Sequence, residues 1–286
     1  MSGVAGSDQL VLSLSCPDGP GIVHAVTGAI ASVDGNIVES QQFGDPTSGR
    51  FFMRVQMEAV ADPPALRAAL QPTAERFSME WNLDTVGRPM RTLIMVSKAS
   101  HCLYDLLYRR SQEHLPADIV AVVSNHTYLS DVAAFYDVPF HHIPVAPDAK
   151  DQAEQELMKL IGRLDVELVV LARYMQILSD QFCSALPGRI INIHHSFLPS
   201  FKGARPYDQA YRRGVKLIGA TAHYVTANLD SGPIIEQDVE RVTHADHPGD
   251  LVALGEDVER RALARAVRWH AEHRILINEG RTVVFR

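Results

Sequence analysis

The sequence Ile190-Ile191-Asn192-Ile193-His194-His195-Ser196 begins with an apolar run and ends in polar residues. Such a run predicts a buried strand over 190–193. In an extended segment the side chains at i and i+2 lie on the same face. Asn192 and His194 should therefore face the same side, while Ile193 faces the core. The stretch predicts a core strand that presents an amide and an imidazole at its carboxyl end.

Similar apolar strands recur through the second part of the chain and alternate with helices. This alternation is typical of an α/β domain with a doubly wound, mostly parallel sheet, in which ligands bind at the carboxyl ends of the strands. We expect strands at 92–96, 118–124, 140–143, 168–171 and 190–193, helices at 102–113, 130–135, 149–162 and 181–185, then an antiparallel pair at 218–226 and 233–242, a long helix at 248–273 and a last strand near 282–285.

The first part of the chain has a different order of elements. Its strands are expected at 10–15, 36–43, 51–58 and 79–86, and its helices at 20–32 and 63–77. The order βαββαβ makes a ferredoxin-like antiparallel sheet with two helices on one face. The segment Gly87-Arg88-Pro89-Met90-Arg91 reads as a linker because glycine and proline punctuate it. We therefore expect one domain at 8–87 and a second at 88–286.

Composition restricts the classes of partner. The 286 residues are 46% hydrophobic and 21% charged, which suits two folded domains. The formal charge is −7 and the basic residues are scattered, so a nucleic-acid partner is disfavoured. No leader-like segment stands at the N-terminus, and no apolar run approaches the ~20 residues that span a bilayer. We expect neither export nor membrane insertion.

The cysteines and paired histidines do not form a recognisable metal or disulfide pattern. Cys16, Cys102 and Cys183 are far apart, which fits a reducing cytoplasm. The pairs His141-His142 and His194-His195 lie on strands, where neighbouring side chains face opposite ways. No metal site is expected. Cys102 lies near a helix start, where a thiolate is favoured, and simple packing is the alternative.

A second polar motif, Asn228-Leu229-Asp230-Ser231-Gly232-Pro233-Ile234, lies between two predicted strands. Gly232 permits a close backbone approach there. Taken singly, Asp230 fits an ordinary Asx turn, and an asparagine or histidine at a strand end is usually structural. Together, Asn192, His194 and Asp230 could hold a carbonyl, stabilise its oxyanion and move the protons of acyl transfer. The combination favours a catalytic site.

These motifs, with Leu198-Pro199-Ser200, resemble the folate-dependent formyltransferase family over residues 92–286. The resemblance implies that Asn192, His194 and Asp230 are catalytic. It implies no cofactor, since 10-formyltetrahydrofolate is itself the substrate. The segment Tyr174-Met175-Gln176-Ile177-Leu178-Ser179 resembles the family loop that wraps the pterin. The folate-binding residues implied are Leu171, Met175, Gln176, Ile177, Leu178, Thr226, Ala227 and Asn228.

One turn departs from the family pattern. Family transferases carry a glycine-rich turn that cradles the acceptor's phosphate, and this chain has Ser97-Lys98-Ala99-Ser100-His101-Cys102. Without glycines the backbone cannot approach a phosphate as closely. Lys98, His101 and Cys102 are near-site candidates that would crowd the second substrate. Water then becomes the acceptor, and the expected reaction is hydrolysis of 10-formyltetrahydrofolate to tetrahydrofolate and formate, which supplies formate for purine synthesis and balances one-carbon pools.

The expected mechanism needs no covalent intermediate. Ser196 and Ser200 lie outside a Gly-x-Ser-x-Gly elbow and are poor nucleophile candidates. Asn192 would donate a hydrogen bond to the formyl oxygen. The residues leave open which group accepts the proton of water. We assign Asp230 as the base and an imidazolium His194 as oxyanion partner and proton donor to N10.

The first domain has its own motif, Cys16-Pro17-Asp18-Gly19-Pro20-Gly21-Ile22-Val23, where a strand turns sharply into a helix with free N–H groups. With the βαββαβ order it resembles the ACT domain, a small-molecule sensing module. The resemblance implies an amino-acid effector at Asp18, Gly19 and Gly21. Packing into a homo-oligomer, either a dimer or a tetramer, is the alternative role.

Two other functions remain open from the sequence. A glycinamide ribonucleotide formyltransferase would share the catalytic trio and folate loop but use an amine acceptor. A non-catalytic regulator that senses amino acids or folate would use the ACT-like module beside a disabled second domain, and the intact trio argues against it. Release of formate without added amine separates the two enzymes.

Overall fold

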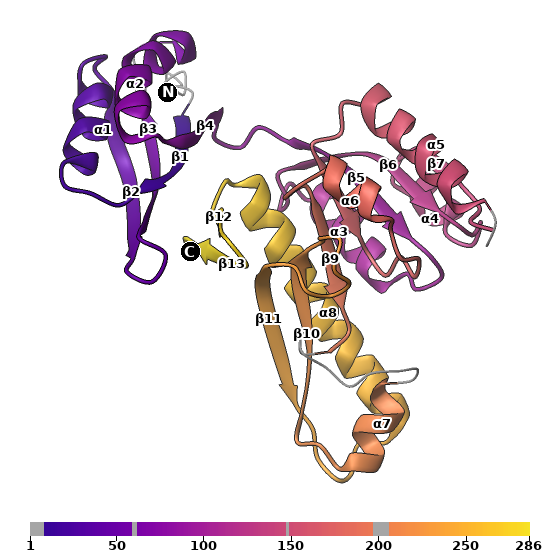
Figure 1. The fold of residues 1–286 in the computed structure, drawn as a ribbon. Helices are drawn as coiled ribbons and strands as arrows, with labels where there is room; N and C mark the ends of the chain where they lie inside the picture. The colour runs from indigo at the N-terminus through magenta and orange to yellow at the C-terminus, as the bar shows by residue number, and fades with distance from the viewer. Residues whose placement is uncertain (1–8, 59–61, 147–148, 197–205) are drawn as a thin grey trace, which may run out of the picture. The chain divides into compact units, whose positions relative to one another are not determined.

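The computed structural model describes residues 9–58, 62–146, 149–196 and 206–286 (Figure 1). They form two compact units. One holds the described residues up to Arg88 together with Glu272–Arg286, and the other spans Pro89–Ala271. Residue 8, the expected start of the first domain, lies outside the described residues. Within the described ranges, no helix is both long enough and apolar enough to cross a bilayer.

The first unit is built on a four-stranded antiparallel sheet in the order β2-β3-β1-β4. The predicted βαββαβ order is therefore confirmed. Alternate residues of the central strands, such as Leu12 and Val55, pack in one core with Val26 of the first helix and Leu66 of the second. The elements are β1 (Gln9–Pro17), α1 (Ile22–Ala31), β2 (Asn36–Asp45), β3 (Arg50–Glu58), α2 (Pro63–Phe77) and β4 (Glu80–Thr85).

The end of the chain packs with this first unit, whereas the sequence grouped it with the second domain. Strands β12 (Ile275–Asn278) and β13 (Arg281–Val284) form a two-stranded antiparallel sheet. Asn278 Nδ2 donates to Asp45 Oδ2 at 2.7 Å, and Arg281 Nη2 lies 2.9 Å from the same oxygen. Asp45 ends β2, so one carboxylate fastens both strands of the hairpin to the sheet.

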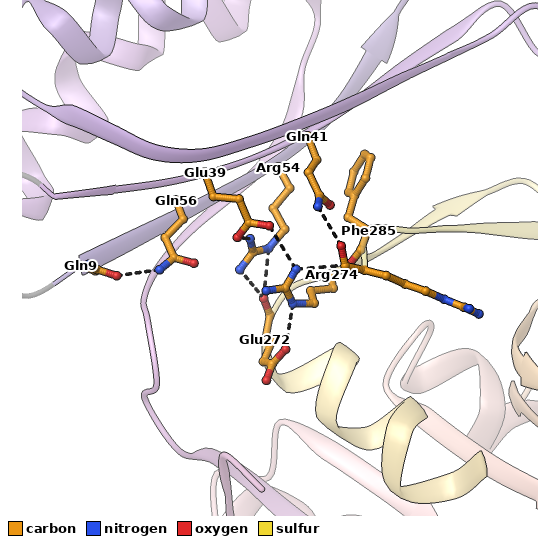
Figure 2. A network of polar contacts seen from close by, with 9 residues as sticks. Gln9, Glu39, Gln41, Arg54, Gln56, Glu272, Arg274 and Phe285 are labelled. Carbon is orange, nitrogen blue, oxygen red and sulfur yellow. Dashed lines mark hydrogen bonds and ion pairs between the residues drawn. The ribbon is translucent and has the colours of Figure 1, made fainter. Parts of the chain in front are cut away.

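A second set of polar contacts holds the segment that leads into this hairpin (Figure 2). Arg54 is only 2% exposed, and its Nη1 donates to Glu39 Oε2 at 2.9 Å. Its Nε and Nη2 donate to the carbonyl of Glu272 at 3.3 and 3.2 Å. Gln41 Nε2 donates to the carbonyl of Arg286 at 2.8 Å. Side chains of β2 and β3 thus bind the C-terminal segment through its carbonyls.

The second unit contains a seven-stranded sheet in the order β11-β10-β9-β8-β5-β6-β7. Strands β9, β8, β5, β6 and β7 run parallel, and β10 and β11 add an antiparallel edge. The predicted mostly parallel sheet and antiparallel pair are confirmed. The strands are β5 (Met90–Val96), β6 (Ala117–Ser124), β7 (Phe140–His142), β8 (Leu168–Leu171), β9 (Ile190–His194), β10 (Leu217–Tyr224) and β11 (Ile234–Arg241).

Both faces of the sheet are covered by helices. Successive residues of the central strand β5 are all buried, with Leu93 0% exposed, Ile94 1% and Met95 0%, and such a run indicates cover on both sides. Leu157 and Leu160 pack in the same core cluster as Leu93. The last helix contacts strands β9 to β11 (Figure 1). The helices are α3 (His101–Ser111), α4 (Ser130–Phe135), α5 (Lys150–Arg163), α6 (Asp180–Ala185), α7 (Pro206–Arg213), which the sequence did not predict, and α8 (Pro248–Ala271).

The strand order reverses at the centre of the sheet. From β5 the chain builds outward through β6 and β7, and then returns to place β8 and β9 on the other side of β5. In doubly wound sheets ligands bind at the carboxyl ends of the strands that flank this reversal. The carboxyl ends of β5, β8 and β9 are therefore where a site is expected.

Candidate active site

Asn192, His194 and Asp230 line one cavity of about 740 Å³. The asparagine and the histidine come from the end of β9, and Ile193 between them is only 3% exposed. Asp230 belongs to the loop between β10 and β11, and its Oδ2 lies 3.5 Å from His194 Nδ1. The structure thus brings together three polar side chains from two segments, at the sheet edge that the strand order selects.

The loop that carries Asp230 bends back on β10. A side chain at Gly232 would meet the carbonyl oxygen of Tyr224 at 1.8 Å, so only glycine fits. The amide of Tyr224 donates to the carbonyl of Pro233 at 2.9 Å, which closes the bend. The hydrogen bond with His194 holds the pKa of Asp230 below its ordinary value despite partial burial. Asp230 is therefore a carboxylate at neutral pH.

A second histidine, His223, fixes the orientation of Asn192. His223 is 2% exposed, and its Nδ1 lies 2.8 Å from the carbonyl of Tyr224. A carbonyl only accepts, so Nδ1 carries the proton, and burial lowers the pKa of His223 and keeps the ring neutral. Its Nε2 then accepts from Asn192 Nδ2 at 3.2 Å. The second amide hydrogen of Asn192 is left for another acceptor.

His195, which the sequence raised only as a metal candidate, also lines the cavity. Its ring stacks on that of His194, with centroids 4.9 Å apart and 19° between the planes. Burial, followed by the positive charge of Arg173, lowers the pKa of His195 to about 4. His195 is therefore uncharged at neutral pH.

Most of the predicted folate residues line the same cavity. Met175 is 61% exposed and Ile177 is 63% exposed, so both offer open apolar surface to a ring. The buried Ser97 positions their loop, because its Oγ accepts from the amide of Met175 at 3.0 Å and donates to Asn125 Oδ1 at 2.7 Å. The predicted residues among the lining are Leu171, Met175, Gln176, Ile177, Leu178, Thr226 and Ala227; Asn228 is exposed and lies outside it.

Some lining residues were not predicted as site residues. Among them are Arg173, Cys183, His195, His223 and Val225. His223 had a sequence signal, since it is an imidazole directly after the small residues Ala220-Thr221-Ala222 in a predicted strand. Arg173 had none, because an arginine directly after a strand usually reaches solvent.

The near-site candidates divide into two groups. Lys98 is exposed, lies 5.9 Å from the centre of the Tyr128 ring and does not line the cavity. His101 and Cys102 are turned inward at the start of α3. His101 Nε2 lies 2.8 Å from Glu259 Oε2. Cys102 is 1% exposed, and burial, followed by the charge of Glu259, raises the pKa of its thiol well above the ordinary value. Cys102 packs as a neutral thiol.

Glu259 on α8 is the centre of a buried cluster. It is 1% exposed; Tyr207 Oη donates to its Oε1 at 3.1 Å, and Arg173 Nε lies 3.4 Å from its Oε2. Burial acts to raise the pKa of Glu259, but His101 and Arg173 outweigh it and keep the pKa below its ordinary value. His101, Cys102 and Glu259 each have one atom that could ligate a metal ion, and these three atoms lie within 4.8 Å of one another. The Glu259 carboxylate is engaged by His101, Arg173 and Tyr207, and Cys102 is a neutral thiol.

Comparisons with known proteins agree with this arrangement over both units. Residues 90–267 match the formyl transferase family, and residues 10–74 match the ACT domain. A formyltetrahydrofolate deformylase of Corynebacterium sp. (strain P-1) is 52% identical over 279 residues, which cover 96% of this chain and 98% of that relative. The crystal structure of formyltetrahydrofolate deformylase from Burkholderia mallei superposes with a TM-score of 0.95 at 50% identity, covering 98% of this chain and 100% of that one.

The chain belongs to the formyltetrahydrofolate deformylase family. Its membership confirms the resemblance to folate-dependent formyltransferases and the ACT-like character of the first unit.

The second unit of this deformylase-family chain is also similar to a transferase. The structure of glycinamide ribonucleotide transformylase 1 from Symbiobacterium toebii aligns with a TM-score of 0.66 at 31% identity. That alignment covers 72% of this chain and 98% of the transformylase chain. Deformylase and transformylase structures therefore share the fold of the second unit.

The candidate effector motif of the deformylase-family chain lies between β1 and α1. Gly21 precedes the helix with φ 90°, a left-handed conformation that favours glycine. The amide of Asp18 donates to the carbonyl of Gly49 at 2.8 Å, and the Asp18 side chain is exposed. Of the family motif, Leu198-Pro199-Ser200 lies outside the described residues.

Proposed function

We propose that this chain hydrolyses 10-formyltetrahydrofolate to tetrahydrofolate and formate, with Asn192, His194 and Asp230 as catalytic residues. The observation that carries the proposal is the convergence of these three side chains in one cavity, beside a loop of exposed apolar residues that suits a pterin ring. The cavity, of about 740 Å³, falls in the ordinary size range of small-molecule sites. The substrate itself supplies the formyl group, and no cofactor is invoked.

Asn192 supports the oxyanion. Its amide is locked by His223, so the free N–H keeps one direction without being reoriented during the reaction. A preorganised donor of this kind typically contributes about 10²–10³ in rate, through a hydrogen bond to the oxygen that becomes negative. His194, two residues along the same strand face, supports the same oxygen.

Asp230 and His194 carry out the proton transfers. Water attacks the formyl carbon while Asp230, which is ionised at neutral pH, accepts a proton from it. The carbon–nitrogen bond then breaks, and the pair of electrons passes to N10, which takes a proton from His194. The products are tetrahydrofolate, formate and one proton released to solvent. No covalent bond to the protein forms.

The turn at the start of α3 favours water over a phosphorylated amine as the acceptor. His101 and Cys102 fill it with buried side chains, and the carboxylate of Glu259 lies against it. The turn therefore has no glycine-rich backbone that could receive a phosphate at close range. Water needs no such cradle.

The test of this function is formate release from 10-formyltetrahydrofolate as the only substrate. We expect tetrahydrofolate and formate in equal amounts, at a rate that does not change when glycinamide ribonucleotide is added. Turnover only with that amine would identify a formyltransferase instead. Binding of folate without any turnover would identify a non-catalytic regulator.

The ACT domain is proposed to restrain this hydrolysis. An unregulated enzyme of this kind would waste activated formyl groups, and the formate it releases can feed purine synthesis. An amino acid bound near Asp18, Gly19 and Gly21 would supply the control, within a homodimer or homotetramer. Kinetics that do not change with candidate amino acids, glycine and methionine first among them, would remove this part of the proposal.

A further inference from the structure

Arg173 brings a positive charge to the lining of the cavity, and the proposed hydrolysis assigns it no role. It follows β8 (Leu168–Leu171), its side chain is 19% exposed, and it lines the cavity with Asn192, His194 and Asp230. Among the described residues of that lining, it is the only arginine or lysine.

A buried anion holds Arg173 in place. Nε lies 3.4 Å from Oε2 of Glu259, which is itself fixed by His101 at 2.8 Å and by Tyr207 at 3.1 Å. That Nε atom is buried and lies in no hydrogen bond of ordinary geometry. The guanidinium is thus anchored by charge at one edge, which leaves its remaining donors for the cavity.

The positive charge of Arg173 acts on a histidine next to the catalytic residues. It is the largest electrostatic influence on His195, and the ring of His195 stacks on His194 with centroids 4.9 Å apart. Arg173 therefore lines the same cavity as the catalytic trio, and its charge acts on the ring that stacks against His194.

Hydrolysis and transfer differ in the charge of the formyl-derived product that leaves the cavity. Transfer to an amine gives a neutral formamide with a single oxygen. Hydrolysis gives formate, an anion with two equivalent oxygens, by way of a tetrahedral intermediate that also carries two. Asn192 and His194 account for one of these oxygens. The oxygen that comes from water is a hydroxyl in the intermediate and shares the negative charge only in formate, so a hydrogen-bond donor that is also a cation suits both stages.

We propose that Arg173 forms a carboxylate subsite, which binds the water-derived oxygen of the tetrahedral intermediate and then the formate product. The inference rests on the proposed hydrolysis and adds the residue that makes this cavity suited to an anionic product. The water oxygen bonds to the formyl carbon and loses one proton to Asp230, so in the tetrahedral intermediate it is a neutral hydroxyl that can accept a hydrogen bond from the guanidinium. This oxygen becomes anionic only when the hydroxyl loses its remaining proton to solvent and formate is formed. When the carbon–nitrogen bond breaks, the same guanidinium holds formate through both oxygens.

An arginine suits this role better than a lysine. The planar guanidinium binds a carboxylate through two parallel hydrogen bonds and stays charged at all accessible pH values. Glu259 balances its charge in the interior, so the cation is retained without a bound anion. The cluster around Glu259 therefore serves the subsite by positioning Arg173.

The backbone of Arg173 offers a clean test. Its φ is 66°, a left-handed conformation that glycine adopts without strain. Arg173→Gly should therefore fold while leaving a space that free guanidinium can enter. The probe is sodium formate, added as a product inhibitor of 10-formyltetrahydrofolate hydrolysis. The control is Arg163→Ala, which removes one exposed positive charge at the end of α5.

In Arg173→Gly we expect formate inhibition to weaken about 10- to 100-fold, as for loss of a charged hydrogen-bonding partner. The KM for 10-formyltetrahydrofolate should change by less than about threefold, kcat should fall, and millimolar guanidinium should restore part of kcat. Arg173→Lys should retain intermediate inhibition. Arg163→Ala should behave as wild type.

Equal formate inhibition in wild type and Arg173→Gly would overturn the subsite, as would a wild-type protein that formate does not inhibit. A large rise in KM without a change in formate inhibition would assign Arg173 to folate binding instead. If wild type releases no formate from 10-formyltetrahydrofolate, the proposed function fails first. Calorimetric titration of formate into both folded proteins then decides the subsite without turnover.

Discussion

Asn192 Nδ2 lies 3.2 Å from Nε2 of the buried His223, whose other ring nitrogen is committed to a backbone carbonyl. This relationship decides which way the Asn192 amide points, because a neutral His223 can only accept at Nε2. The oxyanion donor is thus set by a residue on β10 that need not touch the substrate itself. The catalytic predictions below depend on that preorganisation.

Asn192→Ala should lower kcat by about 10²–10³, because the donor to the developing oxyanion is lost. Asn192 is only partly buried, so thermal or urea unfolding should show a much smaller effect than turnover. The measurement pairs steady-state kinetics with an unfolding curve. A variant that unfolds in parallel with its loss of activity would mark Asn192 as a structural residue.

Asp230→Asn should lower kcat by about 10²–10⁴ with little change in KM, because the base and the partner of His194 are removed together. Asparagine tolerates the left-handed φ of 52° at this position, so the loop should keep its shape. Kinetics at saturating 10-formyltetrahydrofolate check this. Near-normal turnover would reject the assignment of Asp230 as the base.

Gly255→Ala should destabilise the second unit by about 1–3 kcal/mol, because it overpacks a filled site. A methyl group at this position would lie 2.0 Å from Oη of Tyr207 and push that side chain off Glu259. Gly249→Ala in the same helix is the matched control, since nothing lies within 4 Å of its added methyl group. Chemical denaturation compares the two, and equal stabilities would contradict the packing around Glu259.

Acid stability should depend on His195. Its folded pKa of about 4 lies below the ordinary 6.5, so the unfolded chain binds more protons between these values. Its contribution to stability is complete above about pH 6.5 and is lost as the pH falls toward 4. His195→Asn should flatten the decline in unfolding free energy over this window, and replacement of the exposed His114 should not. An unchanged slope in His195→Asn would contradict its burial as a neutral ring.

Deletion of residues 275–286 should loosen the first unit. Asp45 loses Asn278 and Arg281, and Gln41 loses the carbonyl of Arg286. Hydrogen exchange should therefore rise in β2 and stay unchanged in β5 and β6. Protection in β2 equal to that of the full chain would mean that the hairpin contributes nothing to this sheet.

Local patterns predicted most of the fold. The buried run Leu168–Leu171 and the alternation around Ile193 each carry their own signal, and the structure has these strands within a residue of the expected bounds. Gly232 was expected to allow a close approach, and Tyr224 supplies the backbone that it meets. Such features depend on a few neighbouring residues and on backbone sterics.

Pairings between distant parts of the chain could not be predicted in the same way. His101 and Glu259 are separated by 158 residues, and Glu259 stands among charged neighbours that usually indicate a solvated helix face. The C-terminal hairpin is short, and its place with the first unit depends on single side chains such as Asp45. The sequence specifies these contacts only once the sheets have brought the partners together.

The most direct test of water as the acceptor is turnover in H₂¹⁸O with 10-formyltetrahydrofolate as the only substrate, read by mass spectrometry of the formate. We expect enzyme-dependent formate that carries one ¹⁸O atom, formed in step with tetrahydrofolate and suppressed in Asn192→Ala. Formate at the same rate with and without the protein, or a formyl group recovered on an added amine with no labelled formate, would contradict the account.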